Sequence, residues 1–179
     1  MRTVALAARR WLISTWIASG ARPLSAPPVT MQTFRPETIN GRDLVYICLH
    51  GLPDQPYLYA SDWSTAVSAD QLRAARLDGA VVYMAGCFGQ GPVAEALLAA
   101  GAQAVVGDAD STWAGYVLPT GSNALGRLFV AGVRRGETVR EALNGARRQF
   151  LAADPSKRAL ALAETVSILG ESSARLAVA

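Results

Sequence analysis

The sequence has little of several residue types on which common classes of protein depend. Of its 179 residues, two are cysteines (Cys48 and Cys87), one is a histidine (His50), and 17% are charged. Two cysteines cannot build a disulfide framework, and no residues have the spacing of zinc ligands, so we expect neither a metal nor a cofactor. Any histidine-dependent chemistry must use His50.

The charge is also too small and too scattered for a nucleic-acid-binding protein. The net charge is +3, and the arginines form no stripe interleaved with aromatic residues. No stretch is long enough to span a membrane. Because 51% of the residues are hydrophobic, we expect one globular domain over residues 1–179, whose partners include neither nucleic acid nor membrane.

The acidic residues cluster in one part of the chain. Between Asp43 and Asp110 there are eight acids against Arg73 and Arg76, so this segment is net −6 and the remainder is +9. An active region in this segment would favour a cationic partner. The alternative is that these acids are solvated on loops and helix faces.

The N-terminal segment allows two interpretations. "ARRWLISTWIASGARPLSAP" is similar to a twin-Arg export signal with a cleavage site before Pro27. Val4, Ala8, Trp11, Leu12, Thr15 and Trp16 share one helical face, however, and Gly20 ends the pattern. We interpret the segment as a domain helix of a cytoplasmic protein, with export as the alternative.

Apolar runs alternate with helical patterns along the rest of the chain. Buried strands are expected at 43–51, 79–86, 102–107 and 165–169, and a short edge strand within 21–30. Helices are expected from the Ser68–Gln71 capping box, from Pro92 to Ala100, after a cap at Ser122, and from the Thr138–Glu141 capping box. This alternation predicts an α/β three-layer sandwich with a mainly parallel central sheet.

Two of the predicted strands end in residues suited to nucleophilic catalysis. "DLVYICLHG" ends in His50-Gly51 and "GAVVYMAGC" ends in Cys87. At the carboxyl ends of neighbouring strands, an imidazole can take the proton of a thiol while the amides of Gly51 and Cys87 face a substrate carbonyl. The non-catalytic alternative is that Cys87 is a buried structural cysteine and His50 a surface histidine.

The glycines after Cys87 support a different hypothesis. Gly89-x-Gly91-x-x-Ala94 fits a dinucleotide-binding turn, and Asp108 ends the next strand, where a ribose-binding acid belongs. A Rossmann-type NAD(P)-binding module is therefore an alternative, although it leaves the strand ending in His50-Gly51 unexplained. A nucleophile elbow of the α/β-hydrolase type is excluded, because no histidine follows Cys87.

The paired strand ends, together with "EALLAAGAQAVVG", "GETVREALNGAR" and "SILGESSARL", resemble the caspase-like (clan CD) cysteine peptidases. The pattern is most similar to CHAT domains and the gingipain family, over residues 43–177. The resemblance implies a caspase-like fold and a cysteine endopeptidase, with His50 as general base and acid, Cys87 as nucleophile, and the Gly51 and Cys87 amides as the oxyanion hole.

The resemblance also implies a polypeptide substrate and an activating or partner subunit. Relatives that cut after Arg or Lys use an acid in the primary pocket, and here Asp108 and Asp110 are the candidates, with Trp113 as a wall. The part of the chain ahead of the His-Gly strand is shorter than in the family, as in a domain truncated at its N-terminus. This shortness makes an inactive peptidase-like adaptor the non-enzymatic alternative.

Overall fold

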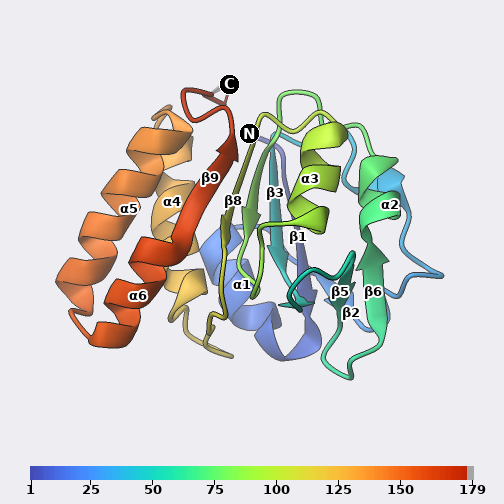
Figure 1. The fold of residues 1–179 in the computed structure, drawn as a ribbon, viewed down its shortest axis with the longest axis horizontal. Helices are drawn as coiled ribbons and strands as arrows, with labels where there is room; N and C mark the ends of the chain where they lie inside the picture. Colours follow the sequence, from blue (N-terminus) through green and yellow to red (C-terminus); the bar gives the residue numbers. More distant parts are fainter. Residues whose placement is uncertain (177–179) are drawn as a thin grey trace.

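The apolar runs of the sequence lie side by side in one six-stranded sheet, shown in Figure 1. The structure is a computed structural model that describes residues 1–176, so residues 177–179 of the predicted domain lie outside the described residues. The strand order is β2-β1-β3-β7-β8-β9, and each pair is parallel except β8 with β9. The strands are β1 (Thr3–Ala8), β2 (Leu24–Ala26), β3 (Leu44–Cys48), β7 (Val81–Met84), β8 (Ala104–Asp108) and β9 (Val166–Gly170).

Helices cover both faces of this sheet, which gives the predicted three layers (Figure 1). One face packs against α1 (Leu12–Ser19), α4 (Ser122–Arg134), α5 (Val139–Ala153) and α6 (Lys157–Thr165). The other face packs against α2 (Ala69–Arg73) and α3 (Pro92–Ala99). Alternate residues of β3 divide between the two cores, as expected for a strand buried on both sides. The predicted α/β fold is confirmed.

A second, three-stranded sheet occupies residues 50–68, where the sequence shows no sign of strands after Gly51. It consists of β4 (His50–Gly51), β5 (Tyr57–Tyr59) and β6 (Thr65–Ser68), paired antiparallel in that order. Only Leu58, Ala66 and Val67 point into the core, so the hydrophobic pattern is too short to mark strands in the sequence. Through β4, the chain leaves the central sheet at His50.

The helix boundaries largely follow local signals. The capping boxes at Ser68–Gln71 and Thr138–Glu141 are both present, and α3 ends just before Gly101. The predicted cap at Ser122 is wrong by one residue. Gly121 is the N-cap of α4, and the Ser122 hydroxyl instead donates a hydrogen bond to the Ala85 carbonyl oxygen.

The predicted N-terminal helix is wrong in its first half. Residues Thr3–Ala8 form β1, which lies between β2 and β3, and Ala5–Ala8 are buried. The apolar run suits a strand inside a parallel sheet, and sheet packing overrides the helical spacing of its residues. A 3-10 turn, η1 (Arg9–Trp11), then leads into α1, which ends at a left-handed Gly20 as predicted. A second 3-10 turn, η2 (Pro36–Thr38), precedes β3.

Residues 1–26 are thus part of the folded domain. The edge strand expected in the Pro-rich segment is confirmed as β2. It pairs with β1 at the edge of the central sheet. Within residues 1–176, no helix has both the length and the apolar character needed to cross a bilayer.

Candidate active site

The segments that follow β3 and β7 run beside each other past the edge of the central sheet. Ile47 pairs with Met84 at the end of the two parallel strands, and the chains continue to His50-Gly51 and Gly86-Cys87. Two glycines permit this approach. A Cβ at position 51 would overlap the Cys87 carbonyl oxygen, and one at position 86 would overlap the Leu49 carbonyl oxygen.

The side chains of His50 and Cys87 border the same small cavity. Its volume is about 20 Å³, enough for roughly one water molecule. It is lined by Trp11, Leu49, His50, Ala85, Gly86, Cys87, Thr112, Trp113 and Ala114. The two residues named from the sequence therefore border one cavity, and its remaining walls come from the segments after β3 and β7, from η1 and from the loop after β8.

Cys87 has polar neighbours from the loop that follows β8. The Thr112 N–H donates to the Cys87 Sγ at 3.3 Å, and the thiol is 3.4 Å from the Thr112 carbonyl oxygen. The next residue, Phe88, has a φ of +50° and donates its N–H to the Asp110 carbonyl oxygen. A bulky residue in the left-handed region is an outlier that the surrounding loop must hold in place.

His50 is held by aromatic rings. Its imidazole lies 4.5 Å from the Trp63 ring, stacked at 22°, and 4.6 Å from the Trp11 ring, tilted at 55°. His50 Nε2 is buried with no hydrogen-bond partner in residues 1–176. Burial, and then the positive charge of Arg10, hold the pKa of His50 below its ordinary value of 6.5. The imidazole therefore tends toward its neutral form, which is the form of a base.

The second cysteine lies in a different environment. Cys48 is fully buried in β3, and burial raises the pKa of its thiol to about 12. The thiol of Cys48 is therefore protonated at neutral pH, whereas Cys87 is partly exposed.

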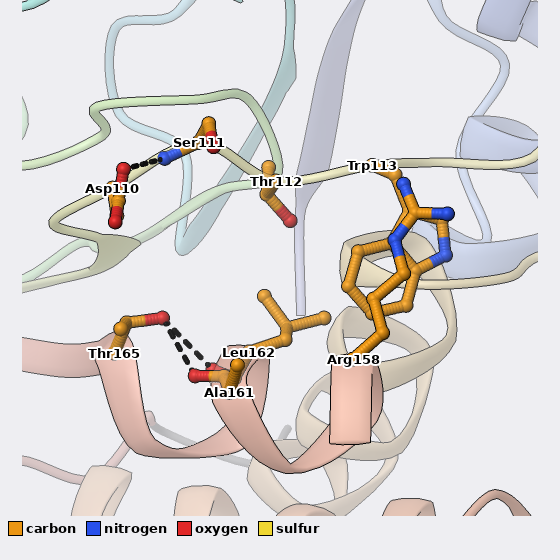
Figure 2. A pocket seen from close by; sticks show the side chains of 8 residues that line it. All are labelled: Asp110, Ser111, Thr112, Trp113, Arg158, Ala161, Leu162 and Thr165. Carbon is orange, nitrogen blue, oxygen red and sulfur yellow. Dashed lines mark hydrogen bonds between the residues drawn. The ribbon is translucent and has the colours of Figure 1, made fainter. Parts of the chain in front are cut away.

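A larger cavity adjoins the first and shares Thr112 and Trp113 with it. Its volume is about 230 Å³, and Figure 2 shows it between the loop after β8 and helix α6. The Arg158 guanidinium lies 4.1 Å from the centroid of the Trp113 ring, over its face. Two of the three predicted substrate-binding residues, Asp110 and Trp113, line this cavity.

The third predicted substrate-binding residue, Asp108, is 1% exposed. Its Oδ1 accepts the Asp110 N–H, and its Oδ2 is buried without a hydrogen bond in the described part of the chain. Burial raises the pKa of the Asp108 carboxyl. In this arrangement Asp108 shapes the loop after β8 rather than facing the cavity.

The glycines of the dinucleotide-like turn have a packing role. A Cβ at Gly107 would come within 2.7 Å of the Gly89 carbonyl oxygen, so these two glycines let the turn lie against β8. Gln90 fastens the same turn by donating from Nε2 to the Gly107 carbonyl oxygen at 2.9 Å and to Ser167 Oγ at 2.6 Å. The buried Asp108 therefore does not present its carboxyl to a ribose at the end of β8.

Sequence reasoning missed Trp11 and Trp63 beside His50, and Thr112 beside Cys87. Trp11 has the spacing of a helix face, and Trp63 stands alone in a polar loop, so neither pattern indicates a site. Thr112 acts through its backbone, which no side-chain pattern reveals. The one available signal was that two of the four tryptophans, Trp63 and Trp113, lie in the segments that follow predicted strands.

No protein-family model and no curated protein matches this sequence. Several solved structures, in contrast, are similar to this chain. The chain is similar to the Arg-specific cysteine proteinase gingipain R, with a TM-score of 0.70 and 11% identity. It is also similar to the complex of Porphyromonas gingivalis RgpB pro- and mature domains, with a TM-score of 0.70 and 10% identity, and to a structure described as a protease, with a TM-score of 0.63 and 14% identity.

Each match covers 99% of this chain and 48% of the other, so the chain spans about half the length of these structures. At such identities the likeness shows the fold, which is the caspase-like α/β fold with a mainly parallel sheet. The gingipain part of the predicted resemblance is thereby supported at the level of fold. The similarity to CHAT domains stays a prediction.

Proposed function

We propose that this chain is a cysteine endopeptidase in which Cys87 is the nucleophile and His50 the general base and acid. The observation that carries the proposal is that the only histidine and the partly exposed cysteine line one cavity, beyond the ends of adjacent parallel strands. The fold shared with cysteine proteinases agrees with this chemistry.

The first half of the reaction would form a thioester. His50 takes the Cys87 thiol proton, and the sulfur attacks the carbonyl carbon of the scissile bond. The carbonyl oxygen becomes an oxyanion, for which the Gly51 and Cys87 amides are the proposed donors. No acceptor for the Cys87 N–H is found in residues 1–176, so this donor is available. The C–N bond then breaks as the imidazolium returns its proton to the departing amine.

The second half would release the acyl group. Neutral His50 takes a proton from a water molecule, whose oxygen attacks the thioester carbon, and the carboxylic acid and the Cys87 thiol are restored. Each step needs a neutral imidazole at its start, which fits the depressed pKa of His50. The Thr112 N–H at the sulfur supports the same assignment, because hydrogen bonds to a charged acceptor are stronger than those to a neutral one.

Peptidase assays on wild type, Cys87→Ala, His50→Ala and the double variant test this proposal. We expect each single variant to lose activity with an unchanged fold, and the double variant to be hardly worse, because base and nucleophile act as one unit. Cys48→Ala is the matched control and should stay active. Activity that survives in Cys87→Ala would refute the mechanism, and an inactive wild type would favour the adaptor.

We further propose that the adjoining cavity receives an Arg or Lys side chain from the residue before the scissile bond. Asp110 would supply the negative charge, and Trp113 already packs against the guanidinium of Arg158. The net charge of −6 over residues 43–110 favours the same substrate. Arg158 must then move aside, since two guanidinium groups cannot share the ring.

Substrate panels on wild type and Arg158→Ala test this specificity. We expect kcat/KM for Arg substrates to rise by about tenfold in Arg158→Ala, because Arg158 no longer competes with the substrate for the Trp113 ring. A tenfold rise corresponds to ~1.4 kcal/mol. A wild-type preference for acidic residues that Arg158→Ala abolishes would instead make Arg158 the partner of the substrate side chain.

A further inference from the structure

Within residues 1–176, His50 has no hydrogen-bonded third group of the kind that orients the base in many nucleophile–base pairs. None of the ion pairs of residues 1–176 involves His50, and its Nε2 has no hydrogen-bond partner there. Its aromatic neighbours are Trp11 and Trp63, one indole from η1 and one from the loop between β5 and β6.

Trp63 adopts a backbone conformation that a bulky side chain rarely takes. Its φ is +64°, and 56% of its surface is exposed. An exposed tryptophan in the left-handed region gains little from burial and costs backbone strain, so packing does not explain it. Such outliers persist where the surrounding structure enforces them, and they concentrate at functional sites.

The loop that carries Trp63 is built to hold this conformation. Ala60 donates its N–H to the Ser64 carbonyl oxygen, and Trp63 donates its N–H to the Ala60 carbonyl oxygen. The Asp62 carboxylate accepts both the Ser64 N–H at 3.1 Å and the Ser64 hydroxyl at 2.6 Å. The backbone that presents the indole is therefore held by hydrogen bonds within the five consecutive residues 60–64.

The two indoles are also tied together. The Arg10 N–H donates to the Ser61 hydroxyl at 3.1 Å, so the residue before Trp11 is bonded to the loop that carries Trp63. On its other side, Trp11 Nε1 donates to the Ala114 carbonyl oxygen at 3.2 Å, in the loop that borders Cys87. Three segments far apart in the sequence thus fix one aromatic enclosure around His50.

We propose that Trp11 and Trp63 form an indole clamp that fixes the orientation of the His50 imidazole, in place of a hydrogen-bonded third residue. Both are positioning residues, and the inference rests on the proposed function of His50. Trp63 stacks on the imidazole and Trp11 contacts it at a tilt, so the ring is held through its carbon framework, and Nε2 has no hydrogen-bond partner in residues 1–176. Removal of the clamp should lower the rate of proton transfer while leaving substrate binding intact.

Trp63→Gly separates this role from a structural one. Glycine accepts a φ of +64° without strain, which offsets the loss of the stacking contact with His50, so we expect the Tm to change by less than about 2–4 °C. The kcat should nevertheless fall by about 10- to 100-fold with little change in KM, because the base is no longer held in register with the thiol. Trp63→Phe keeps a stacking ring and should retain most of the kcat. Trp16→Ala is the control, since Trp16 is a tryptophan of α1 with 54% exposure.

The imidazole signals of His50 provide a readout that needs no activity. His50 is the only histidine, so its ring protons give unambiguous NMR resonances. The ring current of the stacked Trp63 indole shifts the His50 ring protons upfield. We expect Trp63→Gly to move these protons downfield and Trp16→Ala to leave them unchanged. Unmoved resonances, or a raised KM with unchanged kcat, would overturn the clamp. If the wild type were inactive but Trp63→Gly still moved the His50 resonances, the proposed function would be refuted and the contact between the indoles and His50 would stand.

Discussion

His50 is surrounded by groups that favour its neutral form. The imidazole is half-buried beside Trp11 and Trp63, and Arg10 adds a positive charge on the same side of the molecule. Burial and the Arg10 charge both penalise the imidazolium, so the pKa of His50 lies below 6.5. In the proposed role of base, His50 would therefore work at a lower pH than an exposed histidine.

This environment predicts how activity depends on pH. The acidic limb of kcat/KM, where His50 gains a proton, should have its midpoint below 6.5 in the wild type. Arg10→Gln removes a positive charge, which raises the pKa of His50 and moves the limb to higher pH. Arg9→Gln is the control at the neighbouring position of η1. A limb that shifts to lower pH in Arg10→Gln, or equally in both variants, would contradict this account of the charge at His50.

The backbone of Thr112 is predicted to assist Cys87. Thr112→Pro removes the N–H that donates to the sulfur, whereas Thr112→Ala keeps it. We expect the rate of iodoacetamide alkylation of Cys87 to fall by about tenfold in Thr112→Pro, which corresponds to one charge-assisted hydrogen bond. The rate in Thr112→Ala should stay near that of the wild type. Circular dichroism of both variants verifies the fold, and equal rates with an intact fold would remove Thr112 from the account.

His50 and Cys87 could be found in the sequence because each ends an apolar run that reads as a buried strand. Parallel strands bring their carboxyl ends to the same edge, so the topology alone joins the two residues. Trp63 could not be found in this way. Its contact with His50 depends on the turn of residues 60–64, whose conformation follows from local hydrogen bonds.

At the scale of elements, α4 supports the strand β7, which leads to Cys87. The Ser122 hydroxyl donates to the Ala85 carbonyl oxygen at 2.6 Å, and Tyr83 of β7 donates to the Ser122 carbonyl oxygen at 2.9 Å. Both contacts are buried, and they fasten the end of β7 to the start of α4 two residues before Cys87.

Ser122→Ala tests this support. The substitution leaves the buried Ala85 carbonyl without its donor, so we expect the free energy of unfolding to fall by about 1–3 kcal/mol in denaturant titrations. A lost helix cap would not explain the change, because Gly121 occupies the cap position. Ser111→Ala, on the exposed loop after β8, is the control and should change stability by less than about 0.5 kcal/mol. A Ser122→Ala variant as stable as this control would show that the contact does not support β7.

Local signals predicted most of the elements but failed in three places. Capping boxes and glycine stops located α2, α3 and α5, because these signals act within four residues. In β1, the apolar run Val4–Ala8 fits both a helix face and a buried strand, and only its place between β2 and β3 decides between the two. The strands β5 and β6 are too short to show a period, and α6 was not predicted at all.

At the scale of the whole molecule, the N-terminal segment is built into the sheet. β1 pairs with both β2 and β3, and α1 packs on the same core as α4. A fragment of residues 27–179 would leave the buried edge of β3 without a partner strand. We expect this fragment to show no cooperative thermal transition by circular dichroism. A full-sized transition in the fragment would mean that β1 is dispensable.

The central claim, that His50 and Cys87 act as one nucleophile–base pair, is tested most directly by alkylation mapped to each cysteine. Wild type, His50→Asn and Cys48→Ala are treated with iodoacetamide at neutral pH, and labelling is followed by peptide mass spectrometry. We expect rapid labelling of Cys87, no labelling of the buried Cys48, and a rate at Cys87 at least about tenfold lower in His50→Asn. Equal labelling of Cys87 with and without the imidazole would contradict the account.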